Sequence, residues 1–173
     1  NFVKALCSEL VSEGHVVTHS LDSDIDCFFI VDPRPDNDCP GIANYIQNHQ
    51  KFSNVKVVHR VNECDARKNT EHVDGMLLNV SQFVDKTIFV SNWMRSYFEN
   101  KGWRCKDNTF IHNGVDLKNY YPDIQKTQSK KVSFVTHHWS NNILKGFDAY
   151  EFLDYLAGKN LIYFTYIGRH RNS

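Results

Sequence analysis

The chain has 173 residues, of which 41% are hydrophobic, and this is enough apolar material to bury a sizeable core. Twenty Lys and Arg residues balance twenty Asp and Glu residues, so the formal charge is zero and no basic surface predicts a nucleic acid as partner. No apolar run approaches the roughly 20 residues that a membrane-spanning helix needs. We therefore expect no transmembrane segment and leave peripheral contact with a membrane open.

The cysteines and the first residues bear on the protein's location. The five cysteines are scattered, odd in number and never spaced C-x-x-C, which argues against a disulfide scaffold or a zinc cage. This usage favours a reducing, cytoplasmic compartment. The chain begins at Asn1 without an initiator Met or a signal-peptide pattern, so we expect it to be a piece of a longer protein.

Residues 1–115 alternate between helical and strand-like patterns. Such alternation, with nearly continuous apolar strands, predicts an α/β fold with a Rossmann-like, doubly wound parallel sheet covered on both faces. The predicted helices cover 2–13, stopped by Gly14, then 42–46, 73–83 and 93–98, the last with Ser91 as its N-cap, and the predicted strands cover 15–18, 27–31, 55–58, 87–90 and 109–111.

The composition changes after residue 115. Residues 116–131 are polar and without periodicity, which predicts an interdomain linker. A strand over 132–135, a helix over 146–156 and a strand over 161–167 follow, so residues 132–173 read as the start of a second Rossmann-like domain. About 42 residues are too few to complete such a domain.

Several common catalytic motifs are absent from the sequence. It has no G-x-G-x-x-G, no G-x-x-x-x-G-K-[ST], no G-x-S-x-G and no H-E-x-x-H. Dinucleotide-dependent hydride transfer, P-loop nucleotide hydrolysis and two large classes of hydrolase are therefore disfavoured.

Polar residues that follow apolar strands are the natural candidates for a site, because open α/β sheets bind ligands beyond the carboxyl ends of their strands. After the predicted strand 55–58 come His59, Arg60, Asn62 and Asp65, which we interpret as a functional loop. After the strand 109–111 come Asn113 and Gly114, which predict a turn tolerant of positive φ and are equally consistent with a purely structural turn.

A third polar loop follows the strand 132–135 and leads into a helix. Lys145 and Gly146 stand close to the start of that helix, where free N–H groups and a positive dipole favour a phosphate. The adjacent histidines His137 and His138 point to opposite faces of an extended segment, so a shared metal is not expected. Packing by Trp139 and simple capping by 140–142 remain equally good explanations of the loop.

Three motifs, in order, resemble family 4 glycosyltransferases of the GT-B fold, and the resemblance covers most of the chain. They are Phe89-Val90-Ser91-Asn92-Trp93, then Ile111-His112-Asn113-Gly114-Val115-Asp116 with Tyr121-Pro122 after it, and Leu144-Lys145-Gly146-Phe147-Asp148.

The resemblance implies transfer of a sugar from a nucleotide-sugar donor to an acceptor hydroxyl, with retention of configuration and without a metal or other cofactor. By the same resemblance, Lys145 neutralises the donor diphosphate, and His59 and Arg60 lie on the acceptor side. Asn62 and Asp65 extend that loop, and Asn113 and Gly114 belong to the second motif. Where many relatives carry an Arg before the Lys, this chain offers His137, His138 and Asn142.

The family's pair of glutamates would follow Ser173, and its glycine-rich loop would precede Asn1. We therefore expect this chain alone to be inactive or to bind ligand only weakly. The alternatives are a non-catalytic sugar- or partner-binding module and another GT-B sugar enzyme, such as an epimerase.

Overall fold

The computed structural model describes residues 2–20, 24–34, 54–121, 130–138 and 145–168. The chain forms two compact units. The first contains residues 1–61 and 77–111, and the second contains residues 62–76 and 112–173. No helix in the described ranges combines the length and the apolar character needed to cross a bilayer.

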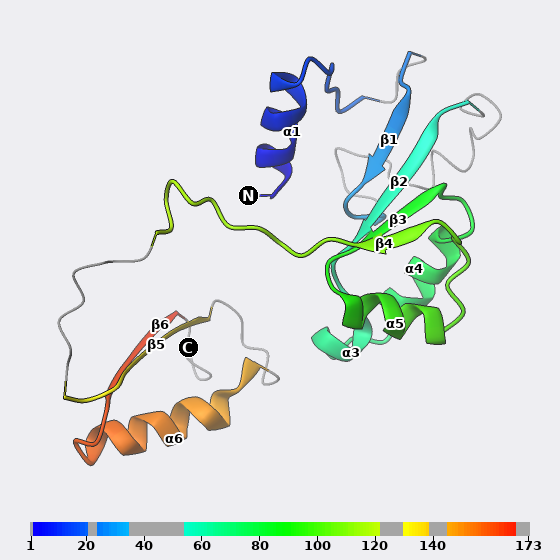
Figure 1. Cartoon of the computed structure of the whole chain (residues 1–173). Coiled ribbons are helices and arrows are strands. Elements are labelled where there is room, and N and C mark those ends of the chain that lie inside the picture. The colour runs from blue at the N-terminus through cyan, green and yellow to red at the C-terminus, as the bar shows by residue number, and fades with distance from the viewer. Residues whose placement is uncertain (1, 21–23, 35–53, 122–129, 139–144, 169–173) are drawn as a thin grey trace. The chain divides into compact units, whose positions relative to one another are not determined.

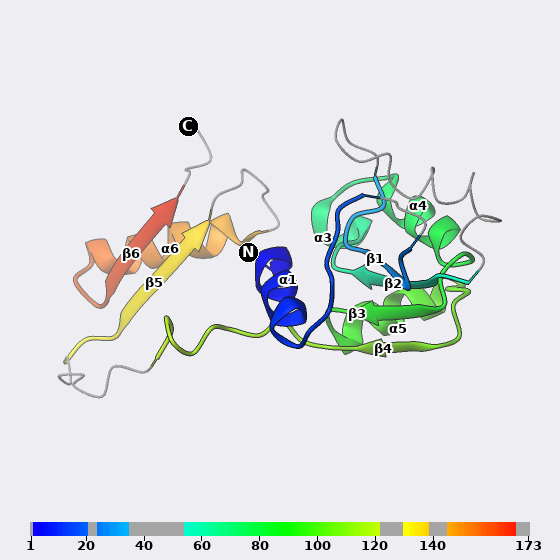
Figure 2. The ribbon, with the colours of Figure 1, turned by 90° about the horizontal axis from the view of Figure 1, so that it is seen from above.

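The first unit is built on a four-stranded, all-parallel sheet, so the chain has an α/β fold compatible with a Rossmann-like arrangement. The strands lie side by side in chain order (Figures 1 and 2). Because parallel crossovers are right-handed, strands that follow one another in this order place their connecting helices on one face. The strands are β1 (Cys27–Ile30), β2 (Lys56–Val61), β3 (Lys86–Phe89) and β4 (Asn108–Phe110), and the connecting helices include α4 (Val73–Val80) and α5 (Asn92–Asn100).

The core lies between the sheet and these helices. Val57 of β2 and Val80 of α4 belong to one buried apolar cluster, with Trp103 packed against it. Phe89 of β3 stacks on Phe98 of α5 with ring centroids 6.0 Å apart, and both side chains are completely buried. The Trp103 indole N–H donates a hydrogen bond to Thr87 Oγ1 at 3.1 Å, which satisfies a polar pair inside this core.

Helix α1 (Phe2–Ser12) confirms the predicted first helix and its glycine stop. Gly14 adopts φ +89, the Gly14 N–H donates to Val11 O, and the His15 N–H donates to Leu10 O. This is the Schellman pattern that closes a helix. The predicted strand at 15–18 is wrong: these residues are irregular, because the backbone of His15 caps the helix instead of pairing in a sheet, and Val16 is 95% exposed.

Two strands extend further along the chain than predicted, so four candidate residues lie in strands and not in the loops that were predicted to follow them. Strand β2 continues to Val61, where it still pairs with Phe89, so His59 and Arg60 belong to the strand and not to a loop after it. Strand β5 (Ser133–His138) likewise includes His137 and His138. In both strands parallel hydrogen bonding with a neighbour outweighs the low strand propensity of polar residues.

The remaining predicted elements of the first half are found with shifted ends, except for the helix at 42–46. One further element is present. A short helix, α3 (Asp65–Lys68), was not predicted. The predicted helix at 42–46 lies outside the described residues. Helix α4 ends at Val80 and not at residue 83, because Ser81 Oγ donates to Leu78 O and accepts a hydrogen bond from the Arg104 N–H.

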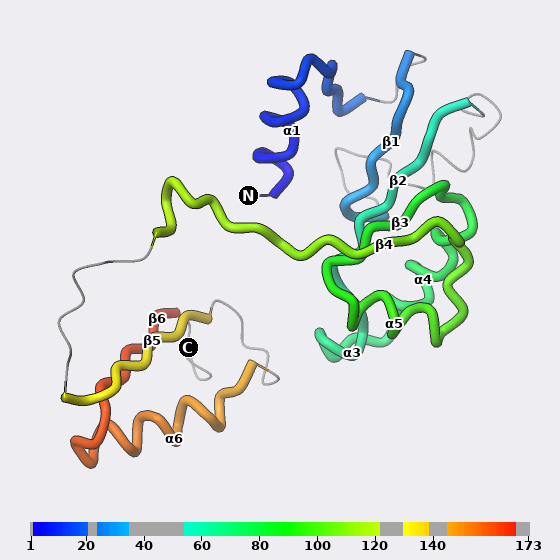
Figure 3. Tube along the Cα trace, viewed as in Figure 1, coloured from blue at the N-terminus to red at the C-terminus, as the bar shows by residue number. Residues whose placement is uncertain are grey.

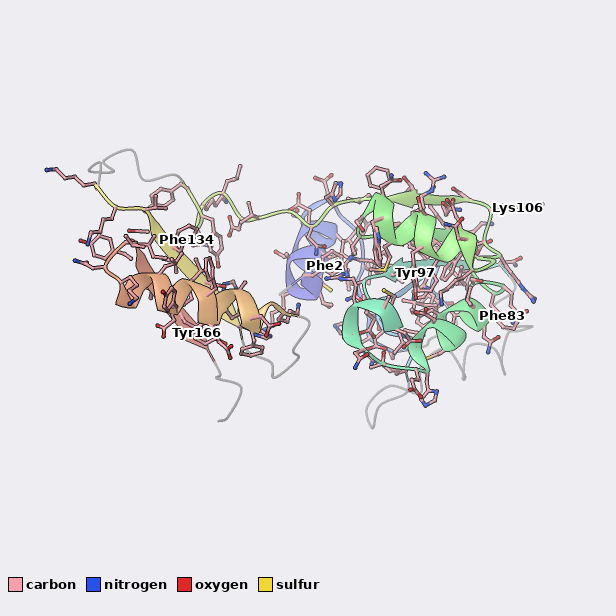
Figure 4. The ribbon with its side chains drawn as sticks, turned by 90° about the horizontal axis from the view of Figure 1, so that it is seen from below. Phe2, Phe83, Tyr97, Lys106, Phe134 and Tyr166 are labelled. Carbon is pink, nitrogen blue, oxygen red and sulfur yellow. The ribbon has the colours of Figure 1, made fainter. Side chains whose placement is uncertain are left out.

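The second unit contains a parallel pair of strands, β5 and β6 (Tyr163–Gly168), connected through α6 (Phe147–Gly158). Phe147 is 3% exposed, and Tyr150 of α6 contacts Tyr166 of β6 with ring centroids 5.4 Å apart. Figure 4 labels Tyr166, which lies on the α6 side of the strands. The strand–helix–strand order agrees with the predicted start of a second α/β region. The predicted domain and linker boundaries themselves stay predictions.

Between β4 and residue 121 the chain follows an extended path with one turn, over 117–119 (Figure 3). Asp116 organises that turn: its carboxylate accepts from the Lys118 N–H at 2.9 Å and from the Asn119 side-chain amide at 2.6 Å.

Replacing Ser91 with Ala should lower the free energy of unfolding by about 1 kcal/mol, the usual value of a helix N-cap. Ser91 Oγ accepts a hydrogen bond from the Met94 N–H at 3.1 Å, which confirms the predicted cap of α5. Urea denaturation measures the loss. The matched control is Ser96→Ala in the exposed part of the same helix, and an equal loss in both variants would contradict the cap.

Candidate functional site

The first group of candidate residues lies on β2, where neighbouring side chains point to opposite faces of the sheet. Val57, His59 and Val61 face the α4 and α5 side and are 0–1% exposed. Arg60 faces the other side and is 7% exposed. The two adjacent candidates therefore occupy different environments, and a single ligand cannot contact both side chains in the same way.

His59 is completely buried, and neither ring nitrogen has a hydrogen-bond partner among the described residues. Its ring stacks on Trp103 with centroids 6.2 Å apart. Burial lowers the pKa of His59 to about 4, although the negative charge of Asp32 acts in the opposite direction. At neutral pH His59 is thus an uncharged imidazole inside the core.

Arg60 carries its charge on the other face of the sheet. Its guanidinium carbon lies 3.8 Å from the centroid of the Phe2 ring, a cation–π contact with the first turn of α1. Burial lowers the pKa of the Arg60 guanidinium, but arginine starts so high that the side chain stays charged. Arg60 is thus a largely buried cation at the carboxyl end of β2.

The two remaining candidates of this group differ sharply. Asn62 is exposed and directly follows β2. The Asp65 carboxylate is occupied by hydrogen bonds: Oδ1 accepts from the Val73 N–H at 3.0 Å and from Thr70 Oγ1 at 2.5 Å, and Oδ2 accepts from the Asp74 N–H at 2.9 Å. Asp74 Oδ1 in turn accepts from the Asp65 N–H at 2.8 Å. Asp65 therefore acts as a cap for the start of α4.

Asn113 and Gly114 lie in the extended segment after β4, and both are exposed. The turn predicted at Asn113-Gly114 is not found there, and Gly114 does not have a positive φ. The turn forms three residues later at Asp116, whose carboxylate replaces the need for a left-handed glycine.

The second group of candidates lies at the carboxyl end of β5. His137 is exposed, whereas His138 is 6% exposed and its ring contacts Phe147, the first residue of α6, at a centroid distance of 5.2 Å. The predicted division of the two histidines between opposite faces is confirmed. Both ring nitrogens of His138 lack a hydrogen-bond partner among the described residues.

The carboxyl ends of β5 and β6 are held close together at this point. Gly168 pairs with His138 and adopts φ +144. A Cβ atom on Gly168 would lie 1.9 Å from His138 O, so only glycine fits there.

Lys145 is exposed and stands two residues before α6. Gly146, the N-cap, has φ +87, and no described side chain caps the helix. The first N–H groups of a helix have no partner within the helix itself, and the helix dipole adds positive potential beside Lys145. The exposed Asp148 in the first turn opposes an anion there. Asn142 lies outside the described residues.

No family model, curated protein or solved structure matches this chain. Its function therefore has to be argued from the chemistry of its own residues and from the resemblance in the three motifs. The described residues contain no group of three or more His, Cys, Asp or Glu side chains placed to hold a metal ion.

Two contacts could not be predicted from the sequence. Phe2 covers Arg60, and Trp103 packs on His59, although each partner is more than 40 positions away in the chain. Glu63 is buried and forms an ion pair with Lys68. In the sequence, Glu63 was marked only by its position between the candidate residues Asn62 and Asp65.

Acidification should destabilise the protein through His59. The unfolded-state pKa near 6.5 exceeds the folded value of about 4, so the unfolded chain binds the proton first. The contribution of His59 to the free energy of unfolding is fully present above pH 6.5 and falls by about 3 kcal/mol as the pH drops to 4. Urea denaturation across this range should show the loss in wild type and less of it in His59→Leu. His137→Leu is the exposed control, and an unchanged pH profile in His59→Leu would contradict the assignment.

Replacing Asp65 with Ala should lower the free energy of unfolding by about 2 kcal/mol, because the backbone N–H groups at the start of α4 lose their acceptors. Thermal or urea denaturation provides the measurement. Asn62→Ala, in the same loop but exposed, should stay within about 0.5 kcal/mol of wild type. Equal stability of both variants would argue against the capping role.

Proposed function

We propose that the chain is part of a glycosyltransferase that moves a sugar from a nucleotide-sugar donor to an acceptor hydroxyl. The observation that carries this proposal is the arrangement around the start of α6. Among the described residues, Lys145 is exposed, no side chain caps the start of α6, and neither ring nitrogen of the buried His138 has a hydrogen-bond partner. This combination suits a phosphate group.

The chemistry of sugar transfer requires such a site. The bond between the anomeric carbon and a diphosphate oxygen breaks, a bond to the acceptor oxygen forms, and negative charge develops on the departing diphosphate. A fixed ammonium and a helix N-terminus stabilise that charge without having to reorganise. We assign this catalytic role to Lys145, and Gly146, with its positive φ, lets the backbone turn into the helix two residues after the lysine.

His138 supplies what an arginine supplies in many members of the family that the motifs resemble. An imidazole can donate a hydrogen bond from either nitrogen, depending on its tautomer, or from both when protonated. A phosphate oxygen at the start of α6 would give the His138 ring a partner. His137 faces the opposite side of the sheet, so the proposal gives it no contact with the donor.

The proposal places the acceptor at the carboxyl end of β2. Arg60 and the exposed Asn62 are the side chains there that suit a polar acceptor. His59 is given a positioning role, because its fully buried ring supports the end of β2 from behind. Asn113 and Gly114 are exposed and stay candidates for backbone contacts. Retention of configuration, independence of a metal and a cytoplasmic location complete the proposal and derive from the motif resemblance and the cysteine usage.

Replacing Lys145 with Ala should weaken binding of the matching nucleotide diphosphate at least tenfold, which corresponds to about 1.4 kcal/mol. Calorimetric titration with UDP, GDP and ADP and their sugar conjugates is the measurement. Lys159→Ala, at the opposite end of α6, is the matched control and should bind as wild type does. If neither the chain nor a longer form of it binds any of these nucleotides, the proposal fails.

A further inference from the structure

Helix α5 carries an exposed aromatic stack on its outer side, separate from the residues assigned above. Trp93 and Tyr97, one helical turn apart, stack with ring centroids 5.2 Å apart and an interplanar angle of 20°. Lys101, a further turn along, places its Nζ 4.9 Å from the centroid of the Tyr97 ring. Trp93 is 53% exposed, a large apolar surface for a side chain held in one orientation.

The stack is anchored in the core and is therefore rigid. Tyr97 contacts Phe98 edge-on, with ring centroids 5.2 Å apart, and Phe98 is completely buried. Phe98 in turn packs on Trp103 and Phe89. A ligand that stacks on Trp93 would therefore meet a preorganised surface and would spend little free energy on ordering it. Figure 4 labels Tyr97 on this helix.

Trp93 also lies at the edge of the sheet where ligands of α/β proteins bind. It is the second residue of α5, which begins three residues after β3 ends. The Val90 N–H donates to Val61 O at 3.1 Å, which ties the start of the helix to the carboxyl end of β2. Tyr97 covers one face of the Trp93 indole, and the opposite face is left to a ligand.

The local charge selects the kind of ligand. The two charged residues of α5, Arg95 and Glu99, neutralise each other in an ion pair at 3.0 Å. Lys101 is engaged with Tyr97. A nucleic acid or an anionic membrane would need a net positive surface around the aromatic rings. A neutral sugar ring suits this surface better. Its apolar face of C–H groups can lie flat on the uncharged indole, and the indole N–H can donate a hydrogen bond to one of the sugar hydroxyls.

We infer that Trp93 is a stacking platform for a neutral sugar ring of the acceptor. The identification of this sugar as the acceptor rests on the proposed function, whereas the platform itself does not. Trp93 is then a specificity-determining residue that selects acceptors with an unsubstituted, uncharged ring at this subsite, next to the end of β2 that carries Arg60.

The test is an NMR titration of the full chain with neutral disaccharides: cellobiose, maltose, lactose, mannobiose and chitobiose. We expect at least one of them to shift the Trp93 indole N–H resonance with a saturable, millimolar dissociation constant. Trp93→Ala should weaken that binding at least tenfold, and Trp93→Tyr should restore part of it. Tyr155→Ala is the matched control, because Tyr155 is also exposed and lies beside Lys159, whereas no other ring of the described residues stacks on it.

Each outcome decides a separate question. If no disaccharide binds, or if Trp93→Ala binds as wild type does, the platform is overturned. Trp93-dependent binding to phosphatidylglycerol vesicles or to oligo-dT without sugar binding would also overturn it, in favour of a membrane or nucleic-acid surface. Sugar binding at Trp93, with no Lys145-dependent nucleotide binding in either the chain or a longer form of it, would keep the platform and reject the glycosyltransferase. Lys145-dependent nucleotide binding without sugar binding would reject the platform and keep the glycosyltransferase.

Discussion

The two-residue period of paired, extended strands is the constraint on which both candidate regions depend. A strand inside a parallel sheet cannot rotate its side chains to one side, so neighbouring residues must serve different faces. In β2 this separates His59, buried under the helices, from Arg60 on the other face. In β5 it separates the buried His138 from the exposed His137. Each adjacent pair thus contributes one interior side chain and one on the opposite face.

Buried histidines without hydrogen-bond partners are costly, and the two such histidines in the described part of the chain lie in different surroundings. Leaving a polar atom buried and unpaired costs about 1–3 kcal/mol. His59 lies among apolar and aromatic side chains, and because burial strongly lowers its pKa, its ring is uncharged at neutral pH. His138 lies at the end of a strand against the first residue of a helix, where a ligand can supply the missing partner. The same side chain is therefore a structural element in one unit and a candidate contact in the other.

Much of the fold was predictable, because apolar periodicity, the glycine stop of α1 and the N-cap of α5 are local signals. Strand ends were predicted less well. Polar residues such as His59 and His138 look like the start of a loop, whereas pairing with a neighbouring strand keeps them extended. The partners of candidate side chains, such as Phe2 on Arg60, depend on contacts between distant residues and left no local signal.

The loop from Asn62 to Asp65 shows why residue type alone cannot assign a role. Asparagine and aspartate occur both in sugar-binding sites and as helix caps, and the sequence pattern is the same for both. What separates them is whether their oxygen atoms are already used. Asp65 spends both oxygens on the start of α4, while Asn62 is exposed. A carboxylate that holds a helix in place could contact a ligand only by giving up those bonds. Asn62 is therefore the better candidate of the two for a contact with the proposed acceptor, while Asp65 holds the start of α4 in place.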